Sequence, residues 1–478
     1  MLFHTLTFAV FFLIVLALIG VARNNTQKKI VLLIASYVFY MWWNPAFVPL
    51  IAASTIVDYA VGLALEKTQR SSHRKWLVVA SICTQLGLLA YFKYAGFLTS
   101  NLFVISRWLG FHPSPFLIDV TLPVGISFYT FATLSYSIDV YRRNIPATKS
   151  LLDFAVFIAF FPHLVAGPIV RASQLLPQLE NENRMRCSQQ TVFLFMRGLA
   201  KKVLVADNLS VFAATILTNP ARWPSLAIWI GAAAFSVQIY CDFSGYSDMA
   251  IAVARVLGYE LPNNFSHPYF ASNPSDFWRR WHITLSSWLR DYLYIPLGGN
   301  RGGWSFVGRN LFLTMLLGGL WHGGSWNFVL WGAWHGVLLI VYRAYTHIRP
   351  HISGLAYFPR AIRRIGSIAL TQLCVVIGWV MFSIRDAGKL LIALRKLLGF
   401  DGNATLGGIG LGSLGLLSCF LIMTAFAIAH FWSYRHGTAE RYLGDVSVRY
   451  AAIIGVAAGL LFCLFWPSAQ AAYIYFQF

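Results

Sequence analysis

The segment RNLFLTMLLGGLWHGGSWNFVLWGAWHGVLLI, residues 309–340, contains an apolar run of about 30 residues that two glycine pairs interrupt. As one helix this run would be roughly 45 Å long at 1.5 Å per residue, whereas the hydrocarbon core of a bilayer is about 30 Å thick. The segment must therefore tilt strongly or break, and Gly318-Gly319 and Gly323-Gly324 mark where a break would fall. Because irregular backbone at membrane depth must be buried in protein or line a wet cavity, the segment predicts an interrupted helix inside a membrane bundle.

The composition of the whole chain agrees with a membrane bundle. Of its 478 residues 58% are hydrophobic and 11% are charged, whereas soluble domains carry about 25% charged residues. A disordered chain, a coiled coil, a nucleic-acid binding module and an ordinary cytosolic enzyme are excluded. We predict an all-α polytopic membrane protein that forms one domain over residues 1–478.

A spanning helix needs about 20 apolar residues, and eleven or twelve segments approach that length, some of them broken or re-entrant. They are 3–22, 30–43, 47–65, 76–97, 118–140, 151–170, 191–217, 224–257, 311–340, 366–384, 408–432 and 451–476. We expect the first of them to be a retained span and not a signal peptide, because no basic residue precedes it.

The net charge of +20 lies mainly in short gaps between apolar runs. The gaps Arg23–Lys29, Lys67–Lys75 and Arg142–Lys149 all fall on the cytoplasmic side if Met1 starts outside, as the positive-inside rule requires. Topology and contact with anionic lipid account for most of this charge, and no nucleic-acid partner is expected. The six cysteines form no CxxC pair, so neither a disulfide framework nor a metal site is predicted.

Two of the twelve histidines stand in the interrupted segment. Eleven helical residues from Leu311 to Trp321 cover roughly 16 Å, which places His322 near the middle of a bilayer. An ionisable group at such depth predicts function, although a core histidine bonded to a backbone carbonyl is the alternative. For His335, packing is the favoured interpretation.

A third histidine lies in SHPYFASNPSDFWRRWHITLSSWLRDYLYIPLGGNR, 266–301, which predicts an amphipathic helix over 274–293. Asn273 suits the N-cap, Pro274 the first helical position and Asp276 the first turn. Apolar residues from Phe277 to Tyr292 follow at helical spacing and define one face, with His282 at the edge of that face.

Two further stretches contain polar groups within apolar sequence. In 159–179, Pro162, Gly167 and Pro168 interrupt a run beside His163 and Arg171, which indicates either an anion site or a plain kink. In 235–250, Gln238, Asp242 and Asp248 lie inside a strongly apolar run. Of the polar groups there, Asp242 and Ser244 need buried partners if they lie within the bilayer.

Four motifs together resemble the membrane-bound O-acyltransferase superfamily, and within it the bacterial branch of alginate O-acetylases, peptidoglycan O-acetylases and teichoic-acid D-alanyl transfer proteins. The motifs are FPHLVAGPIVR (161–171), QIYCDFSGYSDMA (238–250), NNFSHPYFASNPSDFWRRWHITLSSWLRDYLYIPLGGNR (263–301) and GGLWHGGSWNFVLWGAWHG (318–336). The dense match covers about 120–340.

The resemblance implies a ring of tilted helices around a catalytic tunnel. It implies that His322, in the family's WHG motif, is the essential residue and that His282 is the second catalytic position. Further tunnel residues are expected at Trp321, Asp242, Arg279, Arg280 and Asn327.

The resemblance also implies the substrates and the setting. The acyl donor would be cytoplasmic acetyl-CoA with no bound cofactor. The acceptor would be an exported, alginate-like polysaccharide reached directly or through a periplasmic acetyltransferase or acetylesterase-like partner protein. The protein would lie in the bacterial inner membrane.

Two other functions compete with this one. D-alanyl transfer to teichoic acid fits the same branch of the family, although the length and the extra C-terminal spans favour O-acetylation. A transporter or flippase would also use broken helices and a mid-membrane histidine, but no internal repeat is present.

Overall fold

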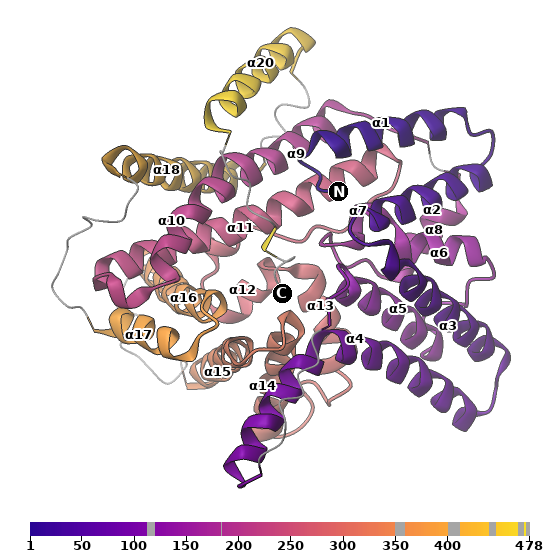
Figure 1. Cartoon of the computed structure of the whole chain (residues 1–478), viewed down its shortest axis with the longest axis horizontal. Coiled ribbons are helices and arrows are strands. Elements are labelled where there is room, and N and C mark those ends of the chain that lie inside the picture. Colours follow the sequence, from indigo (N-terminus) through magenta and orange to yellow (C-terminus); the bar gives the residue numbers. More distant parts are fainter. Residues whose placement is uncertain are drawn as a thin grey trace. The chain divides into compact units, whose positions relative to one another are not determined.

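The structure is a computed structural model that describes residues 1–111, 120–182, 184–348, 359–399, 412–438, 446–466 and 473–474. Every regular element in these ranges is a helix (Figure 1). Six of the helices described are long and apolar enough to cross a bilayer, namely Pro45–Lys67, Ser71–Trp108, Ser225–Val256, Trp326–Ile348, Arg360–Ser383 and Gly415–His436. The all-α polytopic prediction is therefore confirmed, whereas the count of eleven or twelve spans stays a prediction.

The helices group into two compact units. The first unit contains Met1–Ser188 and Met249–Pro262, and the second contains Gln189–Asp248 and Asn263–Phe478. That the whole chain acts as one functional domain stays a prediction.

The first unit begins with α1 (Leu6–Val21) and α2 (Asn25–Met41), which Thr5 and Asn24 cap with their side-chain oxygens. The helices that follow are α3 (Val48–Lys67), α4 (Ser71–Trp108), α5 (Ile126–Tyr141), α6 (Leu151–Ala159), α7 (Phe161–Leu164) and α8 (Ala172–Glu180). Asp58 of α3 is fully buried, and Ser81, Gln85 and Ser137 donate hydrogen bonds to it from α4 and α5. These hydrogen bonds satisfy a carboxyl group whose burial would otherwise be costly inside an apolar bundle.

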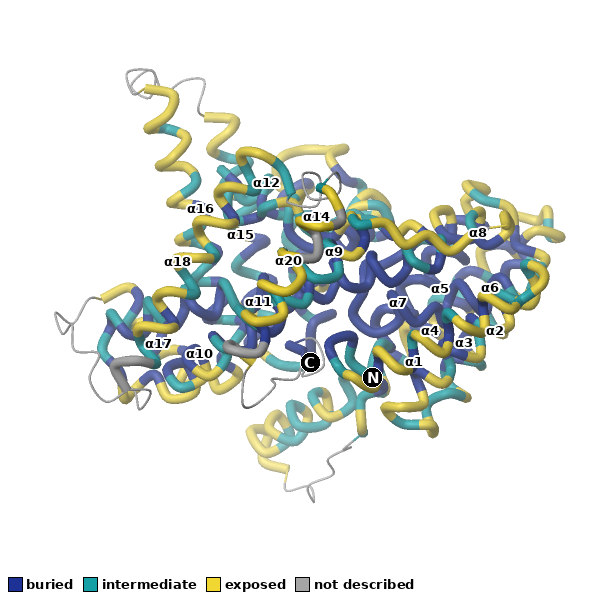
Figure 2. Tube along the Cα trace, turned by 90° about the horizontal axis from the view of Figure 1, so that it is seen from above, coloured by how far each residue is buried: buried dark blue, intermediate teal, exposed yellow. Residues whose placement is uncertain are grey.

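The interruption predicted in 159–179 is present and separates α6, α7 and α8. All of α7 is buried, which Figure 2 shows in dark blue. A Cβ on Gly167 would lie 2.5 Å from the Cα of His163, so only glycine allows the chain to pass there. A ring nitrogen of His163 forms a hydrogen bond with the Phe157 carbonyl at 3.0 Å. Because this bond satisfies the ring within the chain itself, it favours the kink over an anion site.

The second unit supplies the elements around the predicted histidines. They are α9 (Gln189–Ala200), the π-helix η2 (Lys201–Asp207), α10 (Asn208–Leu217), α11 (Ser225–Val256), α12 (Pro274–Arg280), α13 (Ile283–Leu289), the π-helix η5 (Arg290–Tyr294), α14 (Trp304–His322), α15 (Trp326–Ile348), α16 (Arg360–Ser383), α17 (Ala387–Leu398), α18 (Gly412–His436) and α20 (Val448–Phe465). The last residues of α11, from Met249 onward, belong to the first unit.

The long apolar segment 309–340 does break, at the second of its glycine pairs. Helix α14 ends at His322 and α15 begins at Trp326. The first pair stays helical, and its role is close packing: a Cβ on Gly319 would lie 2.9 Å from the Cα of Gly332. The two helices therefore form a tightly packed hairpin with His322 at its turn.

The prediction of one helix over 274–293 is wrong. Asn273 caps α12 as expected, with its side chain accepting from the Asp276 amide. The helix then stops because Trp281 is extended and His282 adopts a left-handed conformation with φ 43°. The backbone turns there to pair with an earlier segment, since the Ile283 amide donates to the Asn264 carbonyl at 2.9 Å. The helical run ends at Tyr294, close to the predicted end at 293, and is followed by Gly298 and Gly299 at positive φ.

Candidate active site

His322 lies at the end of α14 and is 3% exposed. Its ring is enclosed by aromatic side chains from three helices. The centroid distances are 5.0 Å to Trp321, 5.0 Å to Trp331 of α15 and 5.3 Å to Phe382 of α16. This enclosure excludes bulk water and fixes the direction of the imidazole.

His282 lies in the break between α12 and α13 and is fully buried. Its ring contacts Phe243 of α11 edge-on at 4.6 Å between centroids, and the ring of Trp321 lies 6.0 Å away. Trp321 therefore neighbours both histidines. The structure brings together His322, His282 and Trp321, three of the residues expected in the site.

Asn264 orients His282, and sequence reasoning did not single it out. Its Oδ1 accepts hydrogen bonds from the Thr284 amide at 3.3 Å, from the Thr284 hydroxyl at 2.9 Å and from His282 Nδ1 at 3.0 Å. Because a backbone N–H can only donate, this atom of Asn264 is the oxygen, and His282 Nδ1 must carry the proton. The Nε2 atom of His282 is then the ring nitrogen that can accept a proton.

Burial keeps the pKa of His282 well below its ordinary value, so its imidazole is neutral at pH 7. A neutral ring in a fixed tautomer presents one donor and one acceptor in known positions. In the sequence, the only signal for the role of Asn264 is its place in the motif NNFSHPYF.

His335 of α15 is 2% exposed and is packed within the same aromatic layer. Its ring lies 4.9 Å from Trp331 and 5.1 Å from Trp278 between centroids, and it stacks on Phe277. Trp331 is a ring neighbour of both His335 and His322. This geometry favours the packing interpretation.

Two of the expected tunnel residues have structural partners elsewhere. Asp242 is paired with buried Lys202 at 2.7 Å, and its second oxygen accepts from the Ile474 amide. Asn327 donates to the backbone carbonyls of Met381 and Phe382, which ties α15 to α16. Neither interaction involves a histidine of the site.

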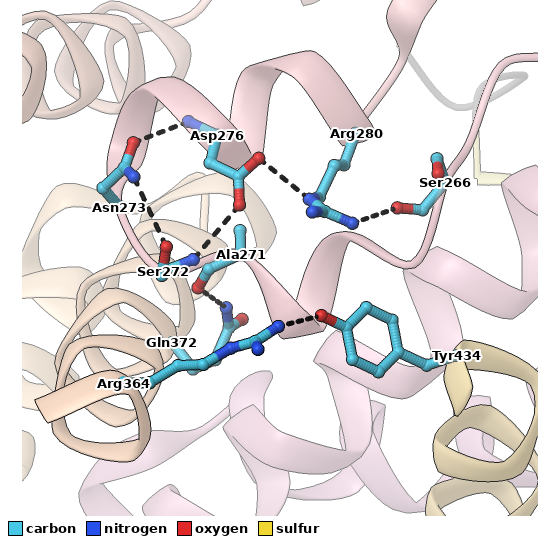
Figure 3. Close-up of polar contacts among 9 residues, drawn as sticks. All are labelled: Ser266, Ala271, Ser272, Asn273, Asp276, Arg280, Arg364, Gln372 and Tyr434. Atoms are coloured by element: carbon cyan, nitrogen blue, oxygen red, sulfur yellow. Dashed lines mark hydrogen bonds and ion pairs between the residues drawn. The ribbon is translucent and has the colours of Figure 1, made fainter. Parts of the chain in front are cut away.

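The two expected arginines differ in their surroundings. Arg279 is exposed and lines a cavity of about 510 Å³, together with Arg290 of η5 and Arg343 of α15. Arg280 is paired instead with Asp276 at 2.9 Å and also donates to the Ser266 carbonyl, as Figure 3 shows. Trp278 lines the cavity too and contacts His335, so the cavity wall adjoins the aromatic layer.

Among the residues that the structure describes, no cluster of three His, Cys, Asp or Glu side chains could hold a metal ion.

A helical bundle with spanning helices and a buried histidine pair defines a polytopic membrane protein with an enclosed site. The family model of MBOAT, the membrane-bound O-acyltransferase family, matches residues 32–379. The chain belongs to this family and is an acyltransferase of the membrane.

Three similar proteins align with most of the length of this chain. A protein named probable alginate O-acetylase AlgI from Pseudomonas aeruginosa is 40% identical over 445 residues, which cover 91% of this chain and 82% of the relative. Another protein of that name from Pseudomonas putida is 43% identical over 387 residues, covering 80% and 77%. A peptidoglycan O-acetyltransferase from Helicobacter pylori is 36% identical over 409 residues, covering 80% and 76%.

Proposed function

We propose that this protein transfers acetyl groups from cytoplasmic acetyl-CoA, across the bacterial inner membrane, to an exported alginate-like polysaccharide. The acceptor class follows the names of the Pseudomonas and Helicobacter relatives, which are O-acetylating enzymes. Those names also favour acetyl transfer over D-alanyl transfer. The observation that supports the proposal most directly is the buried pair His322 and His282, whose rings both neighbour Trp321.

In the proposed reaction His322 is the general base. It takes the proton of the attacking hydroxyl while the oxygen adds to the thioester carbonyl, and the C–S bond then breaks to release CoA. The released sulfur takes up the proton, so the base is restored. An imidazole suits this task because its unperturbed pKa lies near neutrality.

We assign His282 a supporting catalytic role. Since His282 Nδ1 donates to Asn264 Oδ1, Nε2 is the ring nitrogen that would accept a proton in the reaction. His282→Ala is expected to be severely impaired, although less completely than a variant of His322.

We propose that the cavity lined by Arg279, Arg290 and Arg343 receives the phosphate groups of the donor. Its volume of about 510 Å³ is within the range of small-molecule sites, roughly 300–1,000 Å³. Guanidinium groups pair well with phosphate oxygens, and Trp278 offers a ring beside them.

In this proposal the acetyl group leaves the enzyme on the periplasmic side. A periplasmic acetyltransferase or acetylesterase-like protein would carry the acetyl group onward, or the polymer itself would reach the site. Anionic lipid would surround the basic loops.

The test is purified protein with radiolabelled acetyl-CoA, in which release of free CoA and labelling of added polysaccharide are followed. We expect Arg279→Gln to raise the KM for acetyl-CoA about tenfold, since a charged hydrogen bond contributes about 1.5–3 kcal/mol. Arg222→Gln, outside the cavity, should leave KM unchanged. If Arg279→Gln and Arg222→Gln have the same KM for acetyl-CoA, the cavity is not the donor site. If the wild type releases no CoA, acetyl-CoA is not the acyl donor.

A further inference from the structure

A second hollow of the second unit lies between α16 and α18, and neither His322 nor His282 lines it. Its volume is about 650 Å³, and its lining is Phe270, Arg360, Ala361, Arg364, Ile365, Ile368, Ala369, Phe431, Tyr434 and Arg435. We call it the α16–α18 groove. Its wall includes Phe270, which stacks on Tyr434 with 4.3 Å between ring centroids.

The charges in the α16–α18 groove are all positive. Arg360 and Arg364 come from the first two turns of α16, and Arg435 comes from the last turn of α18. All three are exposed, and none forms an ion pair with an acid in the part of the chain that the structure describes. The Tyr434 hydroxyl accepts a hydrogen bond from Arg364 at 2.5 Å, which Figure 3 shows, and so directs that guanidinium.

The rest of the groove is apolar although it is open. Ile365 is 67% exposed and Phe431 is 55% exposed. In water such a surface would be unfavourable, whereas beside lipid chains it has no cost. Both helices are long and apolar enough to span a bilayer, so their arginine-bearing ends come at the level of the headgroups.

We propose that the α16–α18 groove binds one anionic glycerophospholipid. The phosphate would accept hydrogen bonds from the three arginines, and an acyl chain would lie along Ile365, Ile368 and Ala369. Basic pockets between membrane helices are known to suit anionic headgroups. A polysaccharide or a soluble partner would not match a lining that becomes purely apolar within two helical turns of the charges. This proposal is independent of the acetyl-transfer proposal.

The experiment is native mass spectrometry of the full chain, titrated with phosphatidylglycerol or with phosphatidylcholine of the same acyl chains. The wild type should retain one phosphatidylglycerol in preference to phosphatidylcholine. Replacing Arg360, Arg364 and Arg435 together by Gln should weaken phosphatidylglycerol binding at least ~10-fold, since each cation near a headgroup contributes about 1 kcal/mol.

Two further variants make the result specific to the groove. In Arg23→Gln/Arg70→Gln/Arg107→Gln, three exposed arginines of the first unit are removed with the same change of net charge, and phosphatidylglycerol binding should persist. In Ala369→Trp the arginines remain, but the new side chain fills the apolar part of the α16–α18 groove. This variant should no longer retain phosphatidylglycerol in preference to phosphatidylcholine. Retention of the lipid by both the groove triple variant and Ala369→Trp would overturn the proposal, as would equal loss in the control triple variant.

Discussion

At the scale of single residues, the left-handed backbone of His282 depends on one amide side chain. Asn264 accepts from His282 Nδ1 and twice from Thr284, and it donates to Ser247. A non-glycine residue at positive φ is held in place by its surroundings. Asn264 is therefore expected to set both the position and the tautomer of His282.

Asn264→Asp is predicted to make acetyl transfer more sensitive to acid. A carboxylate beside Nδ1 favours the imidazolium and raises the His282 pKa from its lowered value. As pH falls through that raised pKa, Nε2 becomes protonated and can no longer accept a proton. As the solution is made more acidic, CoA release by Asn264→Asp should therefore fall at a higher pH than CoA release by the wild type.

Asn264→Ala separates this role from a structural one. It removes the acceptor and should lower kcat about tenfold or more without shifting the acid limb upward. If both variants show only the wild-type pH profile with lower stability, Asn264 does not act through His282.

At the scale of helices, the α14–α15 hairpin depends on glycine contacts. Gly319→Ala is predicted to destabilise the protein by about 1–3 kcal/mol, the usual cost of overpacking, because its Cβ would meet the backbone of Gly332. The melting temperature in detergent measures this. Gly366→Ala is the matched control, since nothing lies within 4 Å of its Cβ, and it should be neutral or slightly stabilising. Equal melting temperatures for the two variants would contradict the close packing.

The sequence predicted those features that local rules decide. The cap at Asn273, the break before Ser325 and the interruption around Pro162 follow from capping chemistry and from glycine and proline. The break at His282 was missed because the apolar spacing continues in phase through Trp281. Its cause, Asn264, lies 18 residues earlier.

Long-range partners explain the rest of what could not be predicted. Asp242 is paired with Lys202, 40 residues away, and its place in a tunnel stays a prediction. Asn327 binds carbonyls 54 and 55 residues away. A polar residue in an apolar run signals that a partner is needed, but it does not say which one.

At the scale of the whole molecule, the basic loops predict which side of the membrane each end of the first helices faces. In a background with Cys83 and Cys187, both exposed, replaced by Ser, Gln27→Cys and Ser72→Cys should react with an impermeant reagent only from the cytoplasmic side. Asn44→Cys should react only from outside. The reverse pattern of labelling would invert the topology and exchange the donor and acceptor sides of the proposed reaction.

The central claim is that His322 is the base of an acetyl transfer, and its most direct test compares two equally buried histidines. His322→Ala and His335→Ala change rings that are 3% and 2% exposed and that share Trp331 as a neighbour. CoA release from acetyl-CoA is measured for both, with expression and melting temperature as controls. We predict that His322→Ala loses about 10²–10⁴-fold, as removal of a general base does, while His335→Ala retains most activity. A folded His322→Ala variant that releases CoA at close to the wild-type rate would contradict the assignment.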